Sequence, residues 1–178
     1  MLSDDEIKLI WASSENLNPS YQAWIKLLFL CGQRETETAR IRTSQIKDNI
    51  WELASTDTKN KRPSLVPLSS QSQSIINNIK NPKNNYLLTS GVIGDRPING
   101  FSKTKNRIDQ MSSVKEWTWH DIRAAVATNL AKLGYDRLLI KRVLNHKDSS
   151  VTAIYDRYTY INEVRDALQN WADKLDAI

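Results

Sequence analysis

Several features that define other classes of protein are scarce or missing in this sequence. The 178 residues include one cysteine, Cys31, so no internal disulfide can form, and we expect a reducing cytoplasmic environment. One cysteine and two histidines are also too few ligands for a structural zinc site. No apolar run reaches the roughly 18 residues of a membrane-spanning helix. The acidic start, residues 1–6, lacks the apolar core of a signal peptide.

What the sequence does contain is basic charge, concentrated in the middle of the chain. Hydrophobic residues make up 40% and charged residues 25%, which is the balance of a globular domain with a real core. The net charge is +5, and residues 1–33 and 161–178 each carry −2, which leaves +9 for residues 34–160. A basic centre between acidic ends favours a polyanion as partner, although an ordinary basic protein explains the charge alone about equally well.

The spacing of apolar and turn residues predicts a mainly helical domain with one small sheet. Residues 46–54 resemble strand segments around a turn at Asp48 and Asn49, and residues 64–68 a further strand. We therefore expect an antiparallel sheet of about three strands, with Lys59 on a hairpin. No repeat, low-complexity segment or long linker interrupts the chain, so one α+β domain over residues 1–178 is expected. Helices are predicted at residues 3–13, 21–31, 37–42, 71–79, 101–111, 118–133, 136–144 and 162–175.

The last predicted helix is amphipathic. Its apolar residues Val164, Leu168, Trp171 and Leu175 are spaced by four, three and four. Such a helix could pack on its own domain or on a neighbouring copy, and the sequence does not decide between the two.

One polar pair stands at the start of a predicted helix. His120 and Arg123 are three residues apart, so their side chains share one face near the helix N-terminus. The free N–H groups there favour an anion, and Arg123 could hold a phosphate with two donors. Taken alone, the pair is more often a capped helix start with a solvated arginine.

Two further cations lie near predicted turns. Arg34 follows an apolar helix, and Glu37 could orient it from three residues away, although a simple helix-end ion pair is the commoner case. Lys59 lies in a basic turn and could donate a proton, because the pKa of lysine, about 10.4 when unperturbed, falls on desolvation or beside other cations. A turn that only contacts DNA phosphates is the alternative, and Lys61 and Arg62 fit that role.

A histidine and three tyrosines lie near the C-terminal end. His146 follows a predicted helix, and Tyr155 comes nine residues later, with Tyr158 and Tyr160 as competing candidates for a nucleophile. Most tyrosines are packing residues. A phenol with a pKa of about 10 attacks at neutral pH only beside cations or a base, which the two arginines and His120 would supply.

Together these side chains are the groups needed to break and remake a phosphodiester. Arginines hold phosphate oxygens, while lysine and histidines move protons. A tyrosine hydroxyl can attack phosphorus and keep the energy of the broken bond in a covalent link. Their joint order along the chain is more specific than any one of them.

In this order the residues resemble the tyrosine recombinases of the phage-integrase family, over essentially the whole chain. Four stretches carry the resemblance: residues 27–42, LLFLCGQRETETARIR; 57–69, DTKNKRPSLVPLS; 117–131, WTWHDIRAAVATNLA; and 143–158, VLNHKDSSVTAIYDRY. They are similar to the family's first arginine box, its lysine hairpin, its His-x-x-Arg helix, and its second histidine followed by the nucleophile. The chain looks closest to integrases of prophages and genomic islands.

The resemblance implies a role for each residue. Tyr155 would attack the scissile phosphate, form a 3′-phosphotyrosyl link and free a 5′-hydroxyl. The spacing from His146 matches Tyr155 rather than Tyr158 or Tyr160. No metal ion, nucleotide or other cofactor is implied, since the covalent link keeps the bond energy.

The remaining roles also come from the resemblance. Arg34 and Arg123 would stabilise the charged transition state, and Lys59 would protonate the leaving 5′-oxygen. His120 would assist removal of the tyrosine proton, and His146 would hydrogen-bond the phosphate.

The family resemblance also implies the partners. These are double-stranded DNA carrying attachment sites, four protomers on two duplexes, a free protein that could be a monomer, and possible DNA-bending accessory proteins at a bacterial or phage-derived nucleoid. The family's N-terminal DNA-binding domain is absent from this chain, so we expect weak site-specific binding. Candidate phosphate contacts, with a steep salt dependence, are Lys61, Arg62, Lys103, Lys105, Arg107, Lys141, Arg142 and Lys147.

Three other functions stay open at this point. A type IB topoisomerase would use the same chemistry but relax supercoils as a monomer, and a non-catalytic module would bind DNA without forming an adduct. A ribonuclease could use His120, His146 and Lys59 as acid, base and clamp on RNA. The helix predicted after Tyr155 favours a recombinase, since that family can exchange this segment between protomers.

Overall fold

A computed structural model of the chain describes residues 1–79, 84–90, 95–146 and 160–178. Tyr155, Tyr158 and Lys147 lie outside the described residues. The α-helices are α1 Asp4–Ser14, α2 Pro19–Cys31, α3 Glu35–Ala39, α4 Ser70–Ile79, α5 Phe101–Ser112, α6 Trp119–Lys132, α7 Arg137–Val143 and α8 Ile161–Ala177. The strands are β1 Ile46–Lys47, β2 Ile50–Leu53 and β3 Ser64–Pro67, and the 3-10 turns are η1 Thr43–Gln45 and η2 Ser55–Asp57. The predicted mainly helical α+β fold is confirmed.

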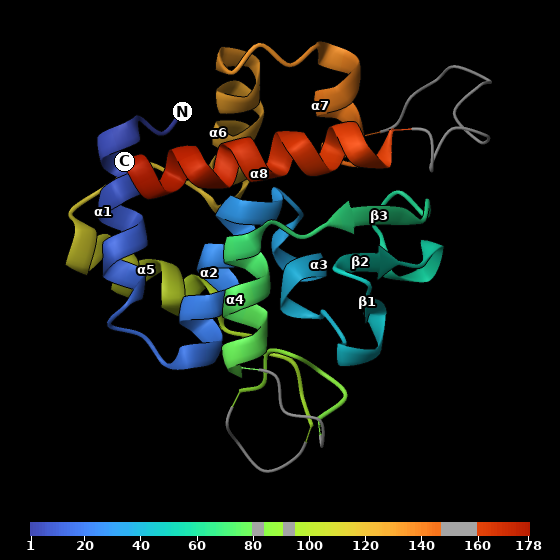
Figure 1. Cartoon of the computed structure of the whole chain (residues 1–178). Coiled ribbons are helices and arrows are strands. Elements are labelled where there is room, and N and C mark those ends of the chain that lie inside the picture. Colours follow the sequence, from blue (N-terminus) through green and yellow to red (C-terminus); the bar gives the residue numbers. More distant parts are fainter. Residues whose placement is uncertain (80–83, 91–94, 147–159) are drawn as a thin grey trace.

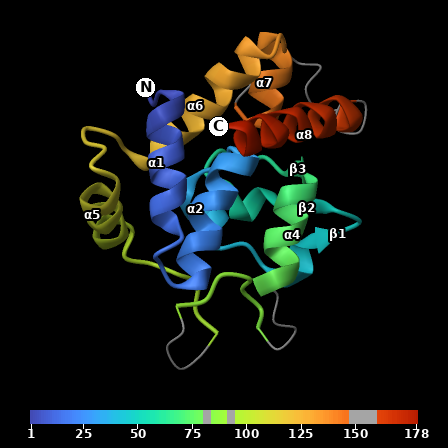
Figure 2. The same cartoon turned by 60° about the vertical axis from the view of Figure 1, so that its left-hand side comes forward.

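Helix α2 runs through the centre of the molecule, with α1, α4, α6 and α8 around it (Figures 1 and 2). Asn18 caps it and Pro19 occupies its first turn, where a missing N–H costs nothing. Trp24 and Phe29 are fully buried within it. Apolar residues on every side of α2 make it the axis of the core.

The end of α2 requires a glycine. Gly32 has φ of +61°, and a Cβ there would lie 3.1 Å from both Val126 Cγ1 and Leu144 Cδ2. The left-handed backbone and the close approach of α6 and of the residue after α7 both favour glycine. This contact places the turn that follows α2 directly against the ends of two other helices.

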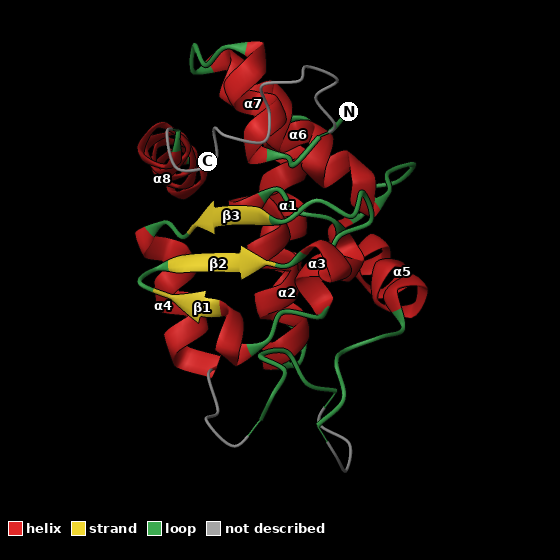
Figure 3. Ribbon diagram, turned by 90° about the vertical axis from the view of Figure 1, so that its right-hand side faces the viewer, coloured by secondary structure: helices red, strands yellow, loops and turns green. Residues whose placement is uncertain are grey.

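The small sheet is antiparallel in the order β1-β2-β3, as predicted. Asp48 and Asn49 both have positive φ between β1 and β2, which is the two-residue turn that matches strand twist. Trp51 on β2 pairs with Val66 on β3, and both side chains are buried. The connection from β2 to β3 carries Lys59, so the predicted hairpin is confirmed; Figure 3 shows it reaching towards α3.

The C-terminal helix α8 packs on its own domain, which answers the question left open by its sequence pattern. Trp171 is fully buried, and its indole N–H donates to the carbonyl of Phe29 at 2.7 Å. Lys174 donates to Asn129 on α6 at 2.6 Å. Val164 and Leu168 are buried on the same face.

The short third helix was predicted two residues too late. It spans Glu35–Ala39 rather than residues 37–42, because Arg34 has an extended backbone and precedes the first helical residue. Arg42 instead forms a bridge with Tyr86. The other predicted helices are found within about two residues of their expected ends.

Candidate active site

Four of the predicted catalytic residues line one groove of about 840 Å³: Arg34, Lys59, His120 and Arg123. The groove lies between the start of α3, the lysine hairpin, α5 and the start of α6; Figure 3 shows α3 between the sheet and α5. Residues from four separate parts of the sequence therefore face one space. Tyr155 is outside the described residues.

Glu37 joins the first arginine to the lysine hairpin. Its Oε1 accepts from Arg34 Nη1 at 2.9 Å and from the backbone N–H of Lys59 at 3.1 Å. Glu37 is 5% exposed, whereas the Arg34 side chain is 23% exposed and open to the groove. The hydrogen bond expected between these two residues is present. One buried carboxylate thus positions both an arginine and the segment that carries the lysine.

Arg123 is held by backbone carbonyls rather than by a carboxylate. It is 3% exposed, and its guanidinium donates to the carbonyls of Gly32 at 2.8 Å and of Leu144. Burial, and then the charge of Arg34, lower its pKa to about 10, so it stays protonated at neutral pH. Two of its five N–H donors are engaged in these bonds, which leaves donors for a phosphate.

His146 does not line the groove, but the end of α7 places it close enough for the charges of Arg123 and Arg34 to act on its imidazole. Asp136 caps this helix by accepting from the backbone N–H of Leu139, and Asn145 adopts the left-handed conformation with φ of +45°. The N–H of His146 then bonds to the carbonyl of Lys141 at 2.9 Å, which closes a Schellman-type turn.

The electrostatic setting of His146 favours its neutral form. Although His146 is solvent-exposed as a residue, partial desolvation of the imidazole lowers its pKa. The positive charges of Arg123 and Arg34 act in the same direction. A neutral imidazole keeps one donor and one acceptor available.

The start of α6 fixes His120. Thr118 and Asp121 form a capping box, and the hydrogen bonds from Thr118 lower the pKa of Asp121. Trp119 packs in an aromatic cluster at the groove: its ring centroid lies 4.6 Å from that of Trp24, in a tilted pair, and 5.1 Å from that of Trp117, in an edge-on pair. His120, next to Trp119, is exposed towards the groove.

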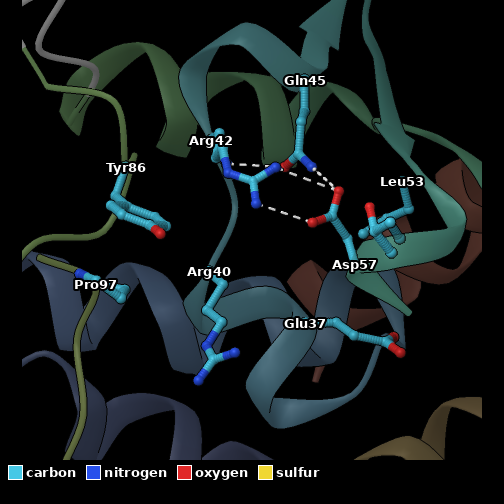
Figure 4. Close-up of a pocket in the computed structure, with 9 residues that line it drawn as sticks. Glu37, Arg40, Arg42, Gln45, Leu53, Asp57, Tyr86 and Pro97 are labelled. Carbon is cyan, nitrogen blue, oxygen red and sulfur yellow. Dashed lines mark hydrogen bonds and ion pairs between the residues drawn. The ribbon is translucent and has the colours of Figure 1, made fainter. Parts of the chain in front are cut away.

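A second cavity, of about 440 Å³, lies at the base of the lysine hairpin (Figure 4). Arg42 donates to both carboxylate oxygens of Asp57, at 2.9 and 3.3 Å, and Gln45 donates to Asp57 at 2.8 Å. Asp57 is two residues before Lys59, so this network anchors one leg of the hairpin. Arg40 points away from the pair in Figure 4.

The predicted phosphate contacts differ in their exposure and in the contacts that they already make within the protein. Lys103 and Arg107 are exposed on α5. Lys105 donates to Asp109 at 2.6 Å and lies 4.2 Å from the centroid of the Trp117 ring, so much of its charge is already compensated. Arg142 stacks on Tyr160, 3.6 Å from the ring centroid.

The other candidate contacts lie at the hairpin and on α7. Lys61 and Arg62 are exposed at the hairpin tip, and Lys141 is half-buried on α7. Contact of these side chains with DNA stays a prediction.

Sequence reasoning missed two amides that connect parts of the site. Gln33 is 1% exposed and donates to two backbone carbonyls. Asn60 donates to the carbonyl of Asn145 at 2.6 Å and links the lysine hairpin to the turn before His146. Their positions, next to Arg34 and Lys59, were the only available signal.

The arrangement can bind and protonate a tetrahedral phosphate. Two arginines offer fixed donors, and Lys59 and His120 can exchange protons beside them. Within the described part of the chain, no group of three or more His, Cys, Asp or Glu side chains could hold a metal ion. No helix among the described residues is long and apolar enough to cross a membrane.

Comparison with known proteins places the chain in a family. The model of the phage integrase family matches residues 1–161, and the chain belongs to this family. A tyrosine recombinase of Thermosipho africanus is 27% identical over 158 residues, which cover 86% of this chain and 56% of that protein. Tyrosine recombinase XerA of Pyrococcus horikoshii is 24% identical over 94% of this chain and 60% of that protein. The chain thus spans a little over half the length of these curated relatives.

Solved structures show the same fold. The XerA recombinase crystal structure has a TM-score of 0.67 at 22% identity, over 97% of this chain and 64% of that chain. The catalytic core of lambda integrase has a TM-score of 0.67 at 18% identity, over 82% of this chain and 94% of that chain. A lambda integrase dimer bound to a COC′ core site has a TM-score of 0.68 over 83% of this chain and 57% of that chain.

Proposed function

We propose that this chain is the catalytic domain of a site-specific DNA recombinase that works through a 3′-phosphotyrosyl intermediate. The observation that carries the proposal is the shared groove of Arg34, Lys59, His120 and Arg123, in a chain of the phage integrase family. These residues come from separate segments and face one space that could hold a phosphate.

In the proposed reaction, the hydroxyl of Tyr155 attacks phosphorus, and the bond from phosphorus to the 5′-oxygen breaks. His120 takes part in removing the phenol proton, and Lys59 protonates the leaving 5′-oxygen. Arg34 and Arg123 hold the non-bridging oxygens, whose charge grows in the transition state. A 5′-hydroxyl from another strand then attacks the phosphotyrosine and releases Tyr155.

The proposed substrate is double-stranded DNA with a specific core site. Support comes from the basic centre of the chain and from the relatives, since lambda integrase and XerH are solved as complexes with core-site or difH DNA. We further propose that four copies assemble on two duplexes, with DNA-bending proteins as possible helpers, at the nucleoid of a bacterial host or on phage-derived DNA. A fuller protein, with DNA-binding residues beyond those of this chain, would bind more tightly.

Covalent trapping tests the proposal. A duplex selected by binding from a randomised pool is nicked near its centre, so that the strand released after cleavage diffuses away and the adduct accumulates. We expect a protein–DNA adduct on a denaturing gel that disappears in Tyr155→Phe. The matched control is Tyr135→Phe, since Tyr135 follows the C-terminal end of α6 whereas the groove lies at the start of that helix, and its hydroxyl accepts a hydrogen bond from Asn170.

The alternative outcomes are distinct. An adduct that survives in Tyr155→Phe moves the nucleophile to Tyr158 or Tyr160. Salt-sensitive binding without any adduct, in a longer chain as well, would contradict the enzymatic proposal and leave a DNA-binding module.

A further inference from the structure

The turn that carries His146 is tied to the turn that carries Arg34 by two side chains. Arg123 donates to the carbonyls of Gly32 and Leu144. Gln33 makes a parallel bridge: its Nε2 donates to the carbonyl of Cys31 at 2.8 Å and to that of Val143 at 2.7 Å. Each side chain thus joins the end of α2 to the end of α7.

The orientation of the Gln33 amide is fixed by its neighbours. Both partners within hydrogen-bond distance are carbonyl oxygens, so only the NH₂ end can face them, and a flipped amide would bring oxygen against oxygen. Its Oε1 is buried with no hydrogen-bond partner among the described residues. A buried acceptor without a partner destabilises the folded chain. Any stabilisation by the Gln33 amide must therefore come from the two hydrogen bonds that it donates.

The Arg123 and Gln33 side chains differ in whether they also have to bind the substrate. If Arg123 contacts the scissile phosphate, as proposed above, its guanidinium must divide its donors between the carbonyls and the phosphate. Gln33 has no such second duty, because it is 1% exposed and both of its N–H groups are already engaged. It can therefore keep the two turns together while Arg123 binds substrate.

We propose that Gln33 is a positioning residue that sets the place of His146 against the two arginines. The link is short: Val143 O accepts from Gln33, and the Schellman turn through Asn145 leads directly to His146. Gln33 never touches the substrate in this role. It acts by holding the end of α7 against the turn between α2 and α3, which carries Arg34.

The proposal predicts a change in the surroundings of His146 when the amide is lost. The charged and titratable groups that act on its imidazole are Arg34 before α3, His120 and Arg123 on α6, and Lys141 on α7. Release of the turn would move His146 away from the arginines and into water. Its pKa, which is lowered in the intact site, would then rise towards the ordinary value of 6.5.

The chain has only two histidines, which makes this measurable by NMR titration of the imidazole C–H signals in the free protein. The variant is Gln33→Met, which keeps an unbranched side chain of similar length but removes both donors. We expect the pKa of His146 to rise. Hydrogen exchange of the His146 amide should also become faster.

Gln73→Met is the matched control. Gln73 is a half-buried amide on α4 whose Nε2 donates to the carbonyl of Leu68 at 2.8 Å, away from the groove. Loss of that bond should leave the titration of His146 unchanged. If Gln33→Met does not fold, Gln33→Asn retains an amide too short to reach both carbonyls, and we expect the same shift in smaller measure.

Trapping with a nicked duplex adds the functional arm, which rests on the proposed function. Gln33→Met should form adduct about ten- to a hundred-fold more slowly, as expected for a misplaced group, with DNA affinity unchanged. A folded Gln33→Met or Gln33→Asn variant with the His146 titration and exchange of the parent would overturn the proposal. Failure of the parent to form any adduct would instead count against the recombinase function, because the titration needs no DNA.

Discussion

The two sides of the groove are held by different chemistry. On the α3 side, the buried carboxylate of Glu37 fixes Arg34 and the backbone of Lys59. Where α6 and α7 meet the end of α2, Arg123 and Gln33 are fixed by backbone carbonyls. A carboxylate can be neutralised by a single substitution, whereas a carbonyl can only be lost by moving the chain. The first side therefore depends on charge and the second on the close approach of helix ends.

Substitution of Arg123 should have the largest effect on activity. Arg123→Lys keeps a positive charge, but its three N–H donors sit on one nitrogen and lack the planar span with which the guanidinium reaches the carbonyls of Gly32 and Leu144 and also a phosphate. We expect the rate of adduct formation to fall by at least about a hundred-fold, the usual result of losing one transition-state donor. Trapping under single-turnover conditions measures it.

Arg165→Lys is the control for this change. Arg165 lies on α8 and donates to Asn162 within its own helix. That variant should trap DNA like the parent. An Arg123→Lys protein with near-parental rates would show that Arg123 makes no transition-state contact that requires its guanidinium.

Gly32→Ala should have the largest effect on stability, because the added methyl group would press against α6 and the residue after α7. A Cβ at φ of +61° costs about 1–2 kcal/mol, and contacts of 3.1 Å with Val126 and Leu144 add an overpacking cost of about 1–3 kcal/mol. Urea unfolding followed by circular dichroism measures the total.

Gly134→Ala separates the two contributions. Gly134 also has positive φ, +90°, but a Cβ there would meet nothing within 4 Å. It should lose only the backbone part. Equal losses in the two variants would mean that the approach of α6 and α7 to Gly32 tolerates an extra methyl group.

Glu37→Gln removes the charge that holds the α3 side of the groove together. The amide can still accept from the Lys59 backbone but no longer neutralises Arg34, whose side chain is 23% exposed. Because solvent reaches Arg34, we expect a loss of about 1–3 kcal/mol in the free energy of unfolding, below the range for a fully buried pair.

Glu15→Gln gives the reference for a surface pair. Glu15 is bonded to Lys26 at the same 2.9 Å, but its side chain is 57% exposed. Glu15→Gln should lower the free energy of unfolding by no more than about 1 kcal/mol. If both variants lose the same stability, burial of Glu37 adds nothing to the first side.

The elements that sequence predicted well are those with local causes. The turn at Asp48 and Asn49 and the helix predicted at residues 136–144, which Asp136 caps, depend on side chains within a few residues. The groove residues were found through motif order, since neither charge nor periodicity brings Arg34 and Arg123 together. Gln33 could not be found in this way, because one of its partners is a backbone carbonyl 110 residues away.

The start of α3 shows a second limit. Arg34 has extended φ and ψ, so the helix begins at Glu35 and the chain can turn from α2 into the groove. A pattern of apolar spacing carries no information on so short a helix. Nothing in the sequence links Asn60 to Asn145 either, although that bond joins the two sides across 85 residues.

The pH dependence of stability should show the smallest effect, and it tests the second side without DNA. The pKa of His146 is lowered in the folded chain, by partial desolvation and by Arg123 and Arg34, while the unfolded chain keeps the ordinary 6.5. Between these two values the unfolded state binds more protons, so the free energy of unfolding should rise with pH up to about 6.5 and then level off. Urea midpoints measured from about pH 5.5 to about pH 7.5, in the parent and in His146→Gln, isolate this contribution from that of the carboxylates. The variant should show a shallower rise, and identical slopes would mean that the arginines do not act on His146 in the folded protein.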